Sequence, residues 1–224
     1  MKIAAINGST KPTNSTSALI IKQIESLLGE KVETHHATQL TKSETPPELI
    51  ASILDSEVLL IVFPLFVDSL PAPLIEFLSR LEKAATEKPS AKKPSEEKTS
   101  RPNAAAPRVF AIVNSGFFEA KQNTLALEMV EHFANRVGAS WGYGIAIGAG
   151  GMLSDMGSDW SKGPMSDAYQ EMRNMVDAIH KNISRQNAFV QPSFPRFLYK
   201  LLADQGLRRM AKQNGVEDIR FRPY

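Results

Sequence analysis

Three features that often carry function are missing from this chain: cysteine, a long hydrophobic run and an excess of one charge. The absence of cysteine among the 224 residues excludes disulfides, thiolate catalysis, cysteine-ligated zinc and cysteine-ligated iron–sulfur clusters. No apolar run approaches the roughly 18 residues of a membrane-spanning helix, and the apolar stretch at residues 1–6 is too short for a signal peptide. We therefore expect a reduced, cytoplasmic protein.

The charge balance and the nucleotide-binding motifs narrow the function further. The chain has 26 Lys and Arg against 24 Asp and Glu, a net charge of +2, so we expect no nucleic acid as a partner. No Walker A loop occurs, and the glycine-rich residues 148–153 lack the last glycine of a dinucleotide fingerprint. Asp155 and Asp159 lie in a polar loop, where carboxylates are usually solvated, and we predict no metal site.

Apolar stretches typical of buried strands alternate with amphipathic stretches typical of helices. The predicted strands are 2–7, 31–37, 57–64, 108–115 and 143–148. The predicted helices are 17–28, 46–54, 70–84, 122–137 and 167–183. This alternation predicts an α/β fold, a flavodoxin-like three-layer sandwich whose five-stranded parallel sheet has the order 2-1-3-4-5.

Two segments fall outside this pattern. Residues 86–107 contain four prolines, mixed charges and no aromatic residue, which predicts a flexible insertion in the domain at 1–184. Residues 185–224 carry eight Lys and Arg against three Asp and Glu and are predicted to form a basic amphipathic helical extension. Its apolar face consists of Phe194, Phe197, Leu198, Leu201 and Leu202. We expect this face to pack on the domain or on a twin subunit; contact with a membrane surface is the less favoured alternative.

The first predicted strand-to-helix junction, residues 7–17, consists entirely of Asn, Gly, Ser, Thr, Lys and Pro. A helix N-terminus has unpaired N–H groups and a partial positive charge, so a hydroxyl-rich loop around it can hold a phosphate monoester. Gly8 permits the tight turn, the Ser and Thr hydroxyls add donors, and Lys11 adds charge. The alternative is that Ser15 or Ser17 only caps the helix.

The junctions after the third and fourth predicted strands are apolar where solvated residues are expected. They read "FPLFVDSLPAPL" at 63–74 and "NSGFFEAKQNT" at 114–124. Apolar loops at two strand ends beside a phosphate cradle indicate that a flat apolar part of a ligand lies between them. The alternative is that Phe66, Phe117 or Phe118 packs against the helices or a partner subunit.

These three junctions, in this order, resemble the superfamily of NAD(P)H-dependent FMN reductases and flavodoxin-like quinone reductases over about residues 1–183. The resemblance implies FMN as cofactor, with its phosphate held by the first loop at Ser9, Lys11, Asn14, Ser15, Thr16 and Ser17. One side of the flavin ring is implied to face Pro64, Leu65, Phe66, Val67 and Asp68. The other side is implied to face Asn114, Ser115, Gly116, Phe117 and Phe118. Related iron–sulfur flavoproteins are excluded, because they need cysteines.

The resemblance also implies an enzyme, an FMN-dependent NAD(P)H oxidoreductase. Hydride is expected to pass from NADPH or NADH to flavin N5 and then to a small-molecule acceptor, a quinone or a second flavin. We expect no catalytic side chain, because the flavin carries the chemistry. Backbone N–H groups around 115–118 are expected to stabilise the reduced flavin, and Phe66 or Phe118 to stack against the nicotinamide.

The expected assembly is a homodimer or homotetramer. The alternative function is a flavodoxin-like electron carrier or regulatory binding module without direct NAD(P)H turnover.

Overall fold

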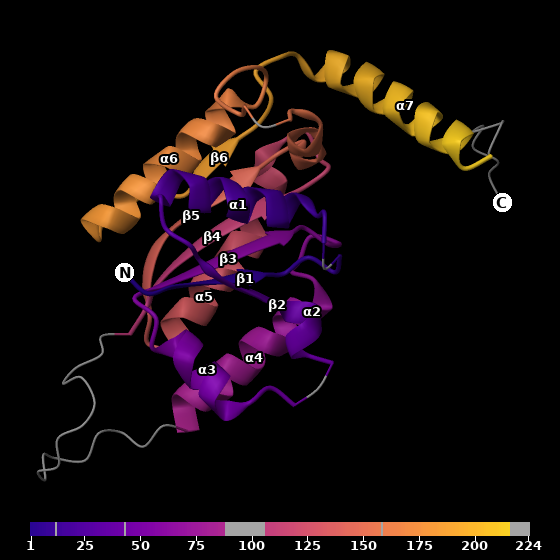
Figure 1. Ribbon diagram of the computed structural model, residues 1–224. Helices are drawn as coiled ribbons and strands as arrows, with labels where there is room; N and C mark the ends of the chain where they lie inside the picture. Colours follow the sequence, from indigo (N-terminus) through magenta and orange to yellow (C-terminus); the bar gives the residue numbers. More distant parts are fainter. Residues whose placement is uncertain (12, 43, 88–105, 158, 216–224) are drawn as a thin grey trace, which may run out of the picture.

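A parallel β-sheet between two layers of helices forms the framework of the protein (Figure 1). The computed structural model describes residues 1–215 apart from 12, 43, 88–105 and 158. The strand order is β2-β1-β3-β4-β5-β6. This order confirms the predicted flavodoxin-like α/β fold, whereas the predicted number of five strands is wrong, because a sixth strand extends the sheet.

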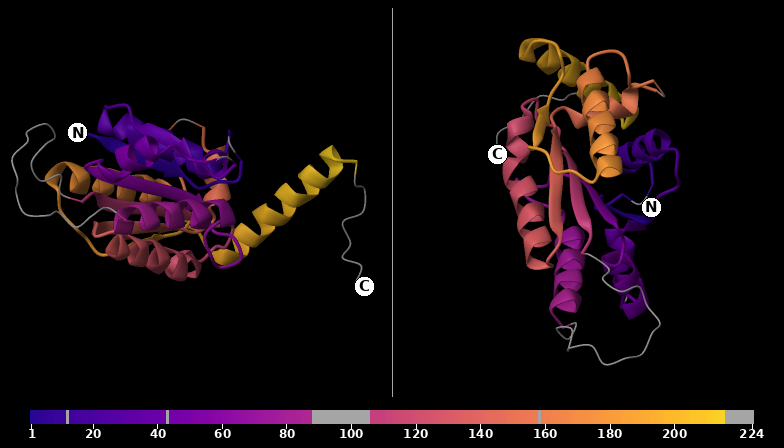
Figure 2. Two further views of the ribbon diagram at one scale, coloured as in Figure 1. Left: turned by 90° about the horizontal axis from the view of Figure 1, so that it is seen from below. Right: turned by 90° about the vertical axis from the view of Figure 1, so that its left-hand side faces the viewer.

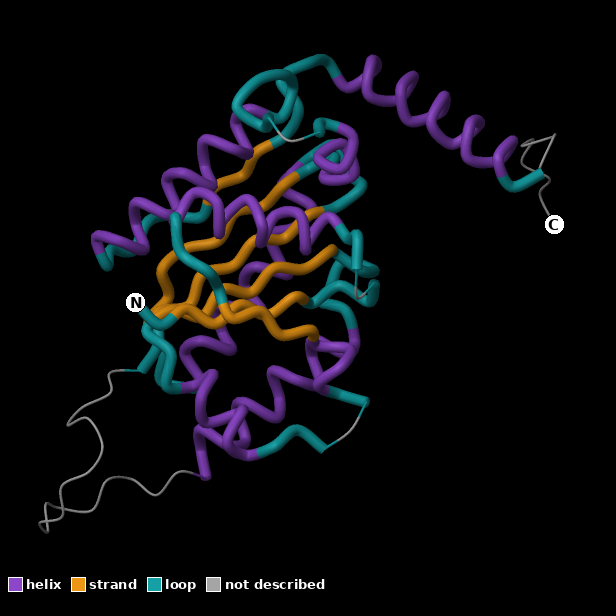
Figure 3. The backbone as a smooth tube through the Cα atoms, in the orientation of Figure 1, coloured by secondary structure: helices purple, strands orange, loops and turns teal. Residues whose placement is uncertain are grey.

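The strands all run in one direction. Their bounds are β1 (Ile3–Asn7), β2 (Glu33–His36), β3 (Val58–Pro64), β4 (Arg108–Asn114), β5 (Ser140–Ile147) and β6 (Ala188–Val190). Every neighbouring pair is parallel, so all carboxyl ends reach the same edge of the sheet, on the right in Figure 3. The loops that leave this edge are therefore brought together although they are far apart in the sequence.

The helices form one layer on each face of the sheet. Their bounds are α1 (Thr16–Leu28), α2 (Ala37–Leu40), α3 (Pro47–Leu54), α4 (Ala72–Glu87), α5 (Thr124–Arg136), α6 (Ser166–Lys181) and α7 (Arg196–Gln213), with short 3-10 helices η1 (Ala120–Asn123) and η2 (Gly150–Asp155). α1 and α6 cover one face, and α3, α4 and α5 cover the other (Figures 1 and 2). The short α2 was not predicted.

The central strand β3 shows why the sheet needs cover on both faces. Leu60 and Val62 join the core cluster under α1 and α6, while Ile61 and Phe63 join the cluster under α4 and α5. Side chains alternate between the faces of a strand, and all four are fully buried. Burying a side chain of this size contributes about 1.5–3 kcal/mol relative to its exposure.

β6 escaped sequence prediction because it has only three residues, none of which is fully buried. Its approach is fixed by the side chain of Asn187, whose Oδ1 accepts hydrogen bonds from the N–H of Gly144 at 2.7 Å and from Nε1 of Trp141 at 3.2 Å. Neither contact leaves a periodic signal in the sequence. The sheet therefore continues beyond residue 184, the predicted end of the domain.

α7 is the helix predicted in the C-terminal extension, and it projects away from the sheet and its helices (Figure 2). Phe197 and Leu201 are 68% and 58% exposed, so this part of the predicted apolar face does not pack on the domain within the described residues, whereas Phe194 lies against Phe118 with ring centroids 6.4 Å apart. Beyond Leu202 the same side of the helix carries Arg208 and Lys212. No helix in the described part of the chain is long and apolar enough to cross a membrane.

Most of the predicted insertion at 86–107, residues 88–105, lies outside the described residues. Thr86 and Glu87 belong to α4, and β4 begins at Arg108. The insertion thus joins the end of α4 to the start of β4.

We expect Phe77→Ala to lower the free energy of unfolding by about 3–5 kcal/mol, because this fully buried side chain fills the core below α4 and its removal leaves a cavity. Leu125→Ala, at a 60% exposed position of α5, is the matched control and should change the free energy by less than about 0.5 kcal/mol, as for other exposed positions. Urea unfolding followed by circular dichroism measures both. An equal loss in the two variants would contradict the explanation by core burial.

Candidate cofactor site at the carboxyl edge of the sheet

The loop from β1 to α1 lies tightly against the sheet where it starts. The N–H of Gly8 donates to the carbonyl oxygen of Val62 at 2.8 Å, which extends the β1–β3 pairing by one residue. A Cβ at Gly8 would lie 2.7 Å from both Phe63 Cβ and Leu74 Cδ2, so a larger residue would have to displace the core. This close approach places the loop directly beside the end of β3.

Some of the backbone N–H groups at the start of α1 have no hydrogen-bond acceptor in this loop. Ser15 caps the helix, since its Oγ accepts from the N–H of Ala18 at 3.2 Å, as the capping alternative predicted. The N–H groups of Thr16 and Ser17 have no acceptor among the described residues. The first turn also contains no acidic residue, so the helix's own carboxylates do not offset its partial positive charge.

The predicted phosphate residues occupy three kinds of position in this loop. Ser9, Ser15 and Ser17 are buried, Thr16 is half-buried, and Lys11 and Asn14 are exposed. The Oγ of Ser9 accepts from the N–H of Lys11 at 3.2 Å, and the Oγ of Ser17 accepts from Nδ2 of Asn114 at 3.4 Å. Because these bonds use the oxygens as acceptors, the hydroxyl hydrogens remain to be donated.

Asn7, the last residue of β1, holds a buried donor without a partner. Its Oδ1 accepts from the N–H of Ser9 at 3.0 Å, which fixes the orientation of the amide group. Nδ2 is buried and has no acceptor among the described residues. An unpaired buried donor costs about 1–3 kcal/mol, so an acceptor at this place would stabilise the protein.

The loop after β3 is a tight turn at residues 66–69. Phe66 and Ser69 exchange two backbone hydrogen bonds of 2.9 and 3.0 Å, and the two residues between them, Val67 and Asp68, have φ values of 49° and 57°. Such a type I′ turn favours Asn and Gly, and a β-branched residue in it is strained by about 1–2 kcal/mol. The Val67 side chain is 98% exposed, so burial in the core does not offset this strain. Pro64 and Leu65 are half-buried behind this turn.

The loop after β4 has all three carbonyl groups of residues 115–117 engaged. The N–H of Gly150 donates to the first at 2.7 Å, and the N–H of Ala149 donates to the third at 2.5 Å. The hydroxyl of Tyr199 donates to the middle one at 2.6 Å. Two backbone groups of the β5–η2 connection and one side chain of α7 thus hold the loop.

The N–H groups of residues 116–118, here called the donor row, are free. In a planar trans peptide, the C=O of one residue and the N–H of the following residue point in opposite directions. Because the carbonyl groups of residues 115–117 are held on one side of the loop, the N–H groups of residues 116–118 point to the opposite side. None of the three has an acceptor among the described residues. The N–H of Ser115 instead donates to the carbonyl oxygen of Ile147 at 3.0 Å. Of the N–H groups predicted at 115–118 to contact the flavin, that of Ser115 is therefore already used.

The aromatic residues of these loops separate into buried and exposed rings. Phe118 is buried, and its ring centroid lies 5.5 Å from that of Tyr199 and 6.4 Å from that of Phe194. The Phe118 ring therefore packs inside the protein, as the alternative to ligand contact predicted. A ring in this position does not suit stacking on a nicotinamide. Phe66 and Phe117 are 44% and 50% exposed and remain as apolar surfaces of the site.

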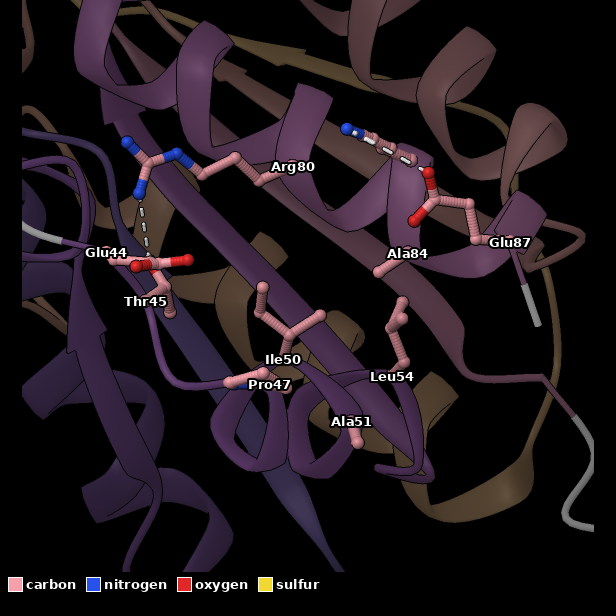
Figure 4. A pocket seen from close by; sticks show the side chains of 10 residues that line it. Glu44, Thr45, Pro47, Ile50, Ala51, Leu54, Arg80, Ala84 and Glu87 are labelled. Atoms are coloured by element: carbon pink, nitrogen blue, oxygen red, sulfur yellow. Dashed lines mark hydrogen bonds and ion pairs between the residues drawn. The ribbon is translucent and has the colours of Figure 1, made fainter.

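A cavity of about 700 Å³ lies between α3 and α4 (Figure 4), and none of its lining residues comes from the three loops. Arg80 in its wall donates to Thr45 Oγ1 at 3.1 Å and pairs with Glu76 at 2.7 Å, so its charge is compensated. In the part of the chain that the structure describes, no three His, Asp or Glu side chains are grouped to hold a metal ion. The carboxyl edge remains the place where unpaired donors gather.

Residues 1–139 match the family described as NADPH-dependent FMN reductase. The chain belongs to this family of FMN reductases. It is accordingly an NAD(P)H-dependent oxidoreductase that uses FMN, as the resemblance of its three loops implied. No curated protein matches the chain in sequence.

Solved structures show the same fold as this FMN reductase. An NADH:FMN oxidoreductase in its apo form has a TM-score of 0.57 and 15% identity, with 87% of this chain and 96% of that chain covered. An NADPH-quinone reductase from P. pentosaceus has a TM-score of 0.52 and 16% identity, with 82% and 100% covered. The Trp repressor binding protein from Bacillus subtilis has a TM-score of 0.52 and 12% identity, with the same coverage. At these identities the likeness establishes the fold alone.

Sequence reasoning missed three features of this reductase's site: the buried amide of Asn7, the two backbone clamps at 149–150 and Tyr199. A polar residue that ends an apolar strand was a signal for Asn7. The clamps and Tyr199 follow from tertiary contacts and had no signal in the local pattern.

We expect Gly148→Ala to disturb this site. A Cβ at Gly148 would overlap the carbonyl oxygen of Phe118 and lie 2.9 Å from the N of Ala120, so the loop after β4 would have to move. The free energy of unfolding should fall by about 1–3 kcal/mol, and FMN affinity should fall with it. Urea unfolding and fluorescence titration with FMN measure the two effects. Gly151→Ala is the matched control, because no atom lies within 4 Å of its added Cβ; a loss as large in this variant would contradict the explanation.

Proposed function

We propose that the loops at 7–17, 64–69 and 114–118 bind FMN at the carboxyl ends of β1, β3 and β4. The observation that carries this proposal is the collection of unpaired donors there. They are Nδ2 of Asn7, the N–H groups of Thr16 and Ser17, and the donor row. FMN offers acceptors of matching kinds, a phosphate dianion and the carbonyl and nitrogen edge of its ring, so the chemistry of the donors fits the group.

The phosphate is assigned to the first loop because its donors surround the start of α1. Thr16 and Ser17 supply N–H groups, the hydroxyls of Thr16 and of the serines supply further donors, and Lys11 supplies a positive charge at the rim. A phosphate here would interact favourably with the helix end by about 0.3–1 kcal/mol, in addition to its hydrogen bonds. Ser9, Asn14 and Ser15 complete the proposed set.

The ring is assigned to the space between the other two loops. Pro64, Leu65, Phe66, Val67 and Asp68 are proposed on one side, and Asn114, Ser115, Gly116, Phe117 and Phe118 on the other. In this arrangement Phe66 and Phe117 exclude water from the ring, while Phe118 supports the loop from behind. Asn114 links the two parts of the site, because its Nδ2 donates to Phe63 O at 3.0 Å and to Ser17 Oγ at 3.4 Å.

The protein's part in the reaction is then to bind, orient and stabilise. FMN, when bound, supplies the hydride and electron transfer. The donor row faces the developing negative charge of the ring, which is the role of preorganised backbone donors in other active sites. We propose NADPH or NADH as the donor and a quinone, a second flavin or a similar small molecule as the acceptor.

A homodimer or homotetramer is proposed as the assembly. The exposed apolar side chains of α7, among them Phe197, Leu201 and Leu202, support this proposal because a partner subunit would bury them. Phe197 lies in the first turn of α7, between Arg196 and Tyr199, and Leu201 and Leu202 lie in the second turn.

We expect the double variant Ser9→Ala/Thr16→Ala to lose its preference for FMN over riboflavin. Each lost hydrogen bond to the phosphate should weaken FMN binding by about 1–3 kcal/mol, whereas riboflavin, which has no phosphate, should bind as it does to the unchanged protein. Fluorescence titration with both ligands gives the ratio of the two dissociation constants.

Ser79→Ala is the control for this experiment, since Ser79 lies on α4 and its hydroxyl donates to the carbonyl oxygen of Ile75. The ratio of its dissociation constants for FMN and riboflavin should equal that of the unchanged protein. If the double variant also keeps this ratio, the phosphate does not lie in the first loop. Anaerobic stopped-flow mixing of the FMN-loaded protein with NADPH or NADH tests the activity, because an electron carrier would not be reduced directly at a useful rate.

A further inference from the structure

The chain from the end of β6 to the first turn of α7 contacts the segments that follow β4 and β5 at several points. The carbonyl oxygen of Val190 accepts from the N–H of Gly148 at 2.9 Å, and Oε1 of Gln191 accepts from the N–H of Ala120 at 3.4 Å. Nη1 of Arg196 lies 2.9 Å from Oε1 of Glu119. The C-terminal part of the protein is thus attached to the edge at which the proposed FMN site lies.

Tyr199 makes the contact nearest to the donor row. Its hydroxyl donates to the carbonyl oxygen of Gly116 at 2.6 Å, and its ring packs on Phe118 with centroids 5.5 Å apart. Burial raises the pKa of Tyr199 above its usual value, so the hydroxyl keeps its proton at neutral pH and remains a donor.

The middle peptide of the loop depends on this one side chain. The carbonyl groups on either side of it are held by backbone N–H groups of Ala149 and Gly150. Gly116 itself has no side chain, and no atom lies within 4 Å of the position of a Cβ. The position of a Cβ is therefore open, and among the described residues the Tyr199 hydroxyl is the hydrogen-bond donor that holds the Gly116 carbonyl.

We propose that Tyr199 is a positioning residue for the donor row, which sets the direction of the Phe117 N–H by holding the Gly116 carbonyl. The two groups belong to one planar peptide, so the orientation of one determines that of the other. This inference rests on the proposed function, in which the donor row faces the flavin ring. It gives the C-terminal helix, which lies beyond residues 1–139 of the family match, a part in the chemistry of the site.

Tyr199→Phe tests the proposal, because it removes the hydroxyl and keeps the ring on Phe118. A donor aimed at the ring contributes most when the ring is reduced and negatively charged. We therefore expect the affinity for reduced FMN to fall about tenfold, the size of one hydrogen bond to a charged group, and the affinity for oxidised FMN to change less than about threefold. The midpoint potential of the bound flavin should become more negative, as measured by equilibration with a reference dye.

Tyr169→Phe is the matched control. Tyr169 is half-buried on α6, and its hydroxyl has no hydrogen-bond partner in the described part of the chain, so neither affinity nor potential should change. In the protein without FMN, the amide resonances of residues 116–118 should shift in Tyr199→Phe and stay in place in Tyr169→Phe.

The outcomes separate this inference from the proposed function. If the unchanged protein does not bind FMN, the proposed function fails. If it binds FMN and Tyr199→Phe keeps its potential and its amide resonances, the positioning role is wrong. An equal loss of affinity for oxidised and reduced FMN would also overturn it, because that result indicates support of the fold alone.

Discussion

Parallel pairing of β1, β3 and β4 is the constraint on which the site depends. The register places Asn7 beside Val62 and Pro64 beside Asn114, so three strands that are far apart in sequence end within two residues of one another. Each strand is buried on both faces and has no freedom to slip without exposing its apolar side chains. The loops that follow these strands therefore start close together at the carboxyl edge of the sheet. The start of α1, to which the phosphate is assigned, the apolar turn after β3 and the row of backbone donors after β4 thus lie at the same edge of the sheet, although they are far apart in the sequence.

The donors at this edge are unpaired because the neighbouring acceptors are used elsewhere. In the loop after β4, three carbonyl groups point toward the β5–η2 connection and α7, and the N–H groups consequently point the other way. In the first loop, the serine oxygens accept backbone hydrogen bonds and keep their hydrogens for a ligand. Such groups lower the stability of the empty protein, and a bound anion recovers that free energy. Binding and folding are therefore coupled through the same hydrogen bonds.

The sequence allowed the prediction of the elements with strong local signals. The apolar runs predicted β1, β3, β4 and β5, and the polar junction at 7–17 predicted a helix start capped by Ser15 or Ser17, of which Ser15 is the cap. β6 could not be predicted because three half-exposed residues carry no period, and its place depends on hydrogen bonds of the adjacent Asn187 with the distant Trp141 and Gly144. Phe118 was one of two rings expected to stack on the nicotinamide, because exposed and buried loop aromatics look alike in sequence. Its contacts with Phe194 and Tyr199 hold its ring inside the protein. The apolar side chains of α7 predicted burial, yet they are exposed within the described chain.

The chain leaves α4 at Glu87 and returns at Ala106, next to the amino end of β4, whereas the proposed site occupies the opposite edge of the sheet. The seven-residue strand β4 separates the two ends of that connection from the proposed cofactor loops. A fluorescent label or an affinity tag attached at Glu87 or Ala106 would lie at the edge of the sheet opposite to the proposed flavin site. Such a fusion would let binding and assembly be followed in the same molecule.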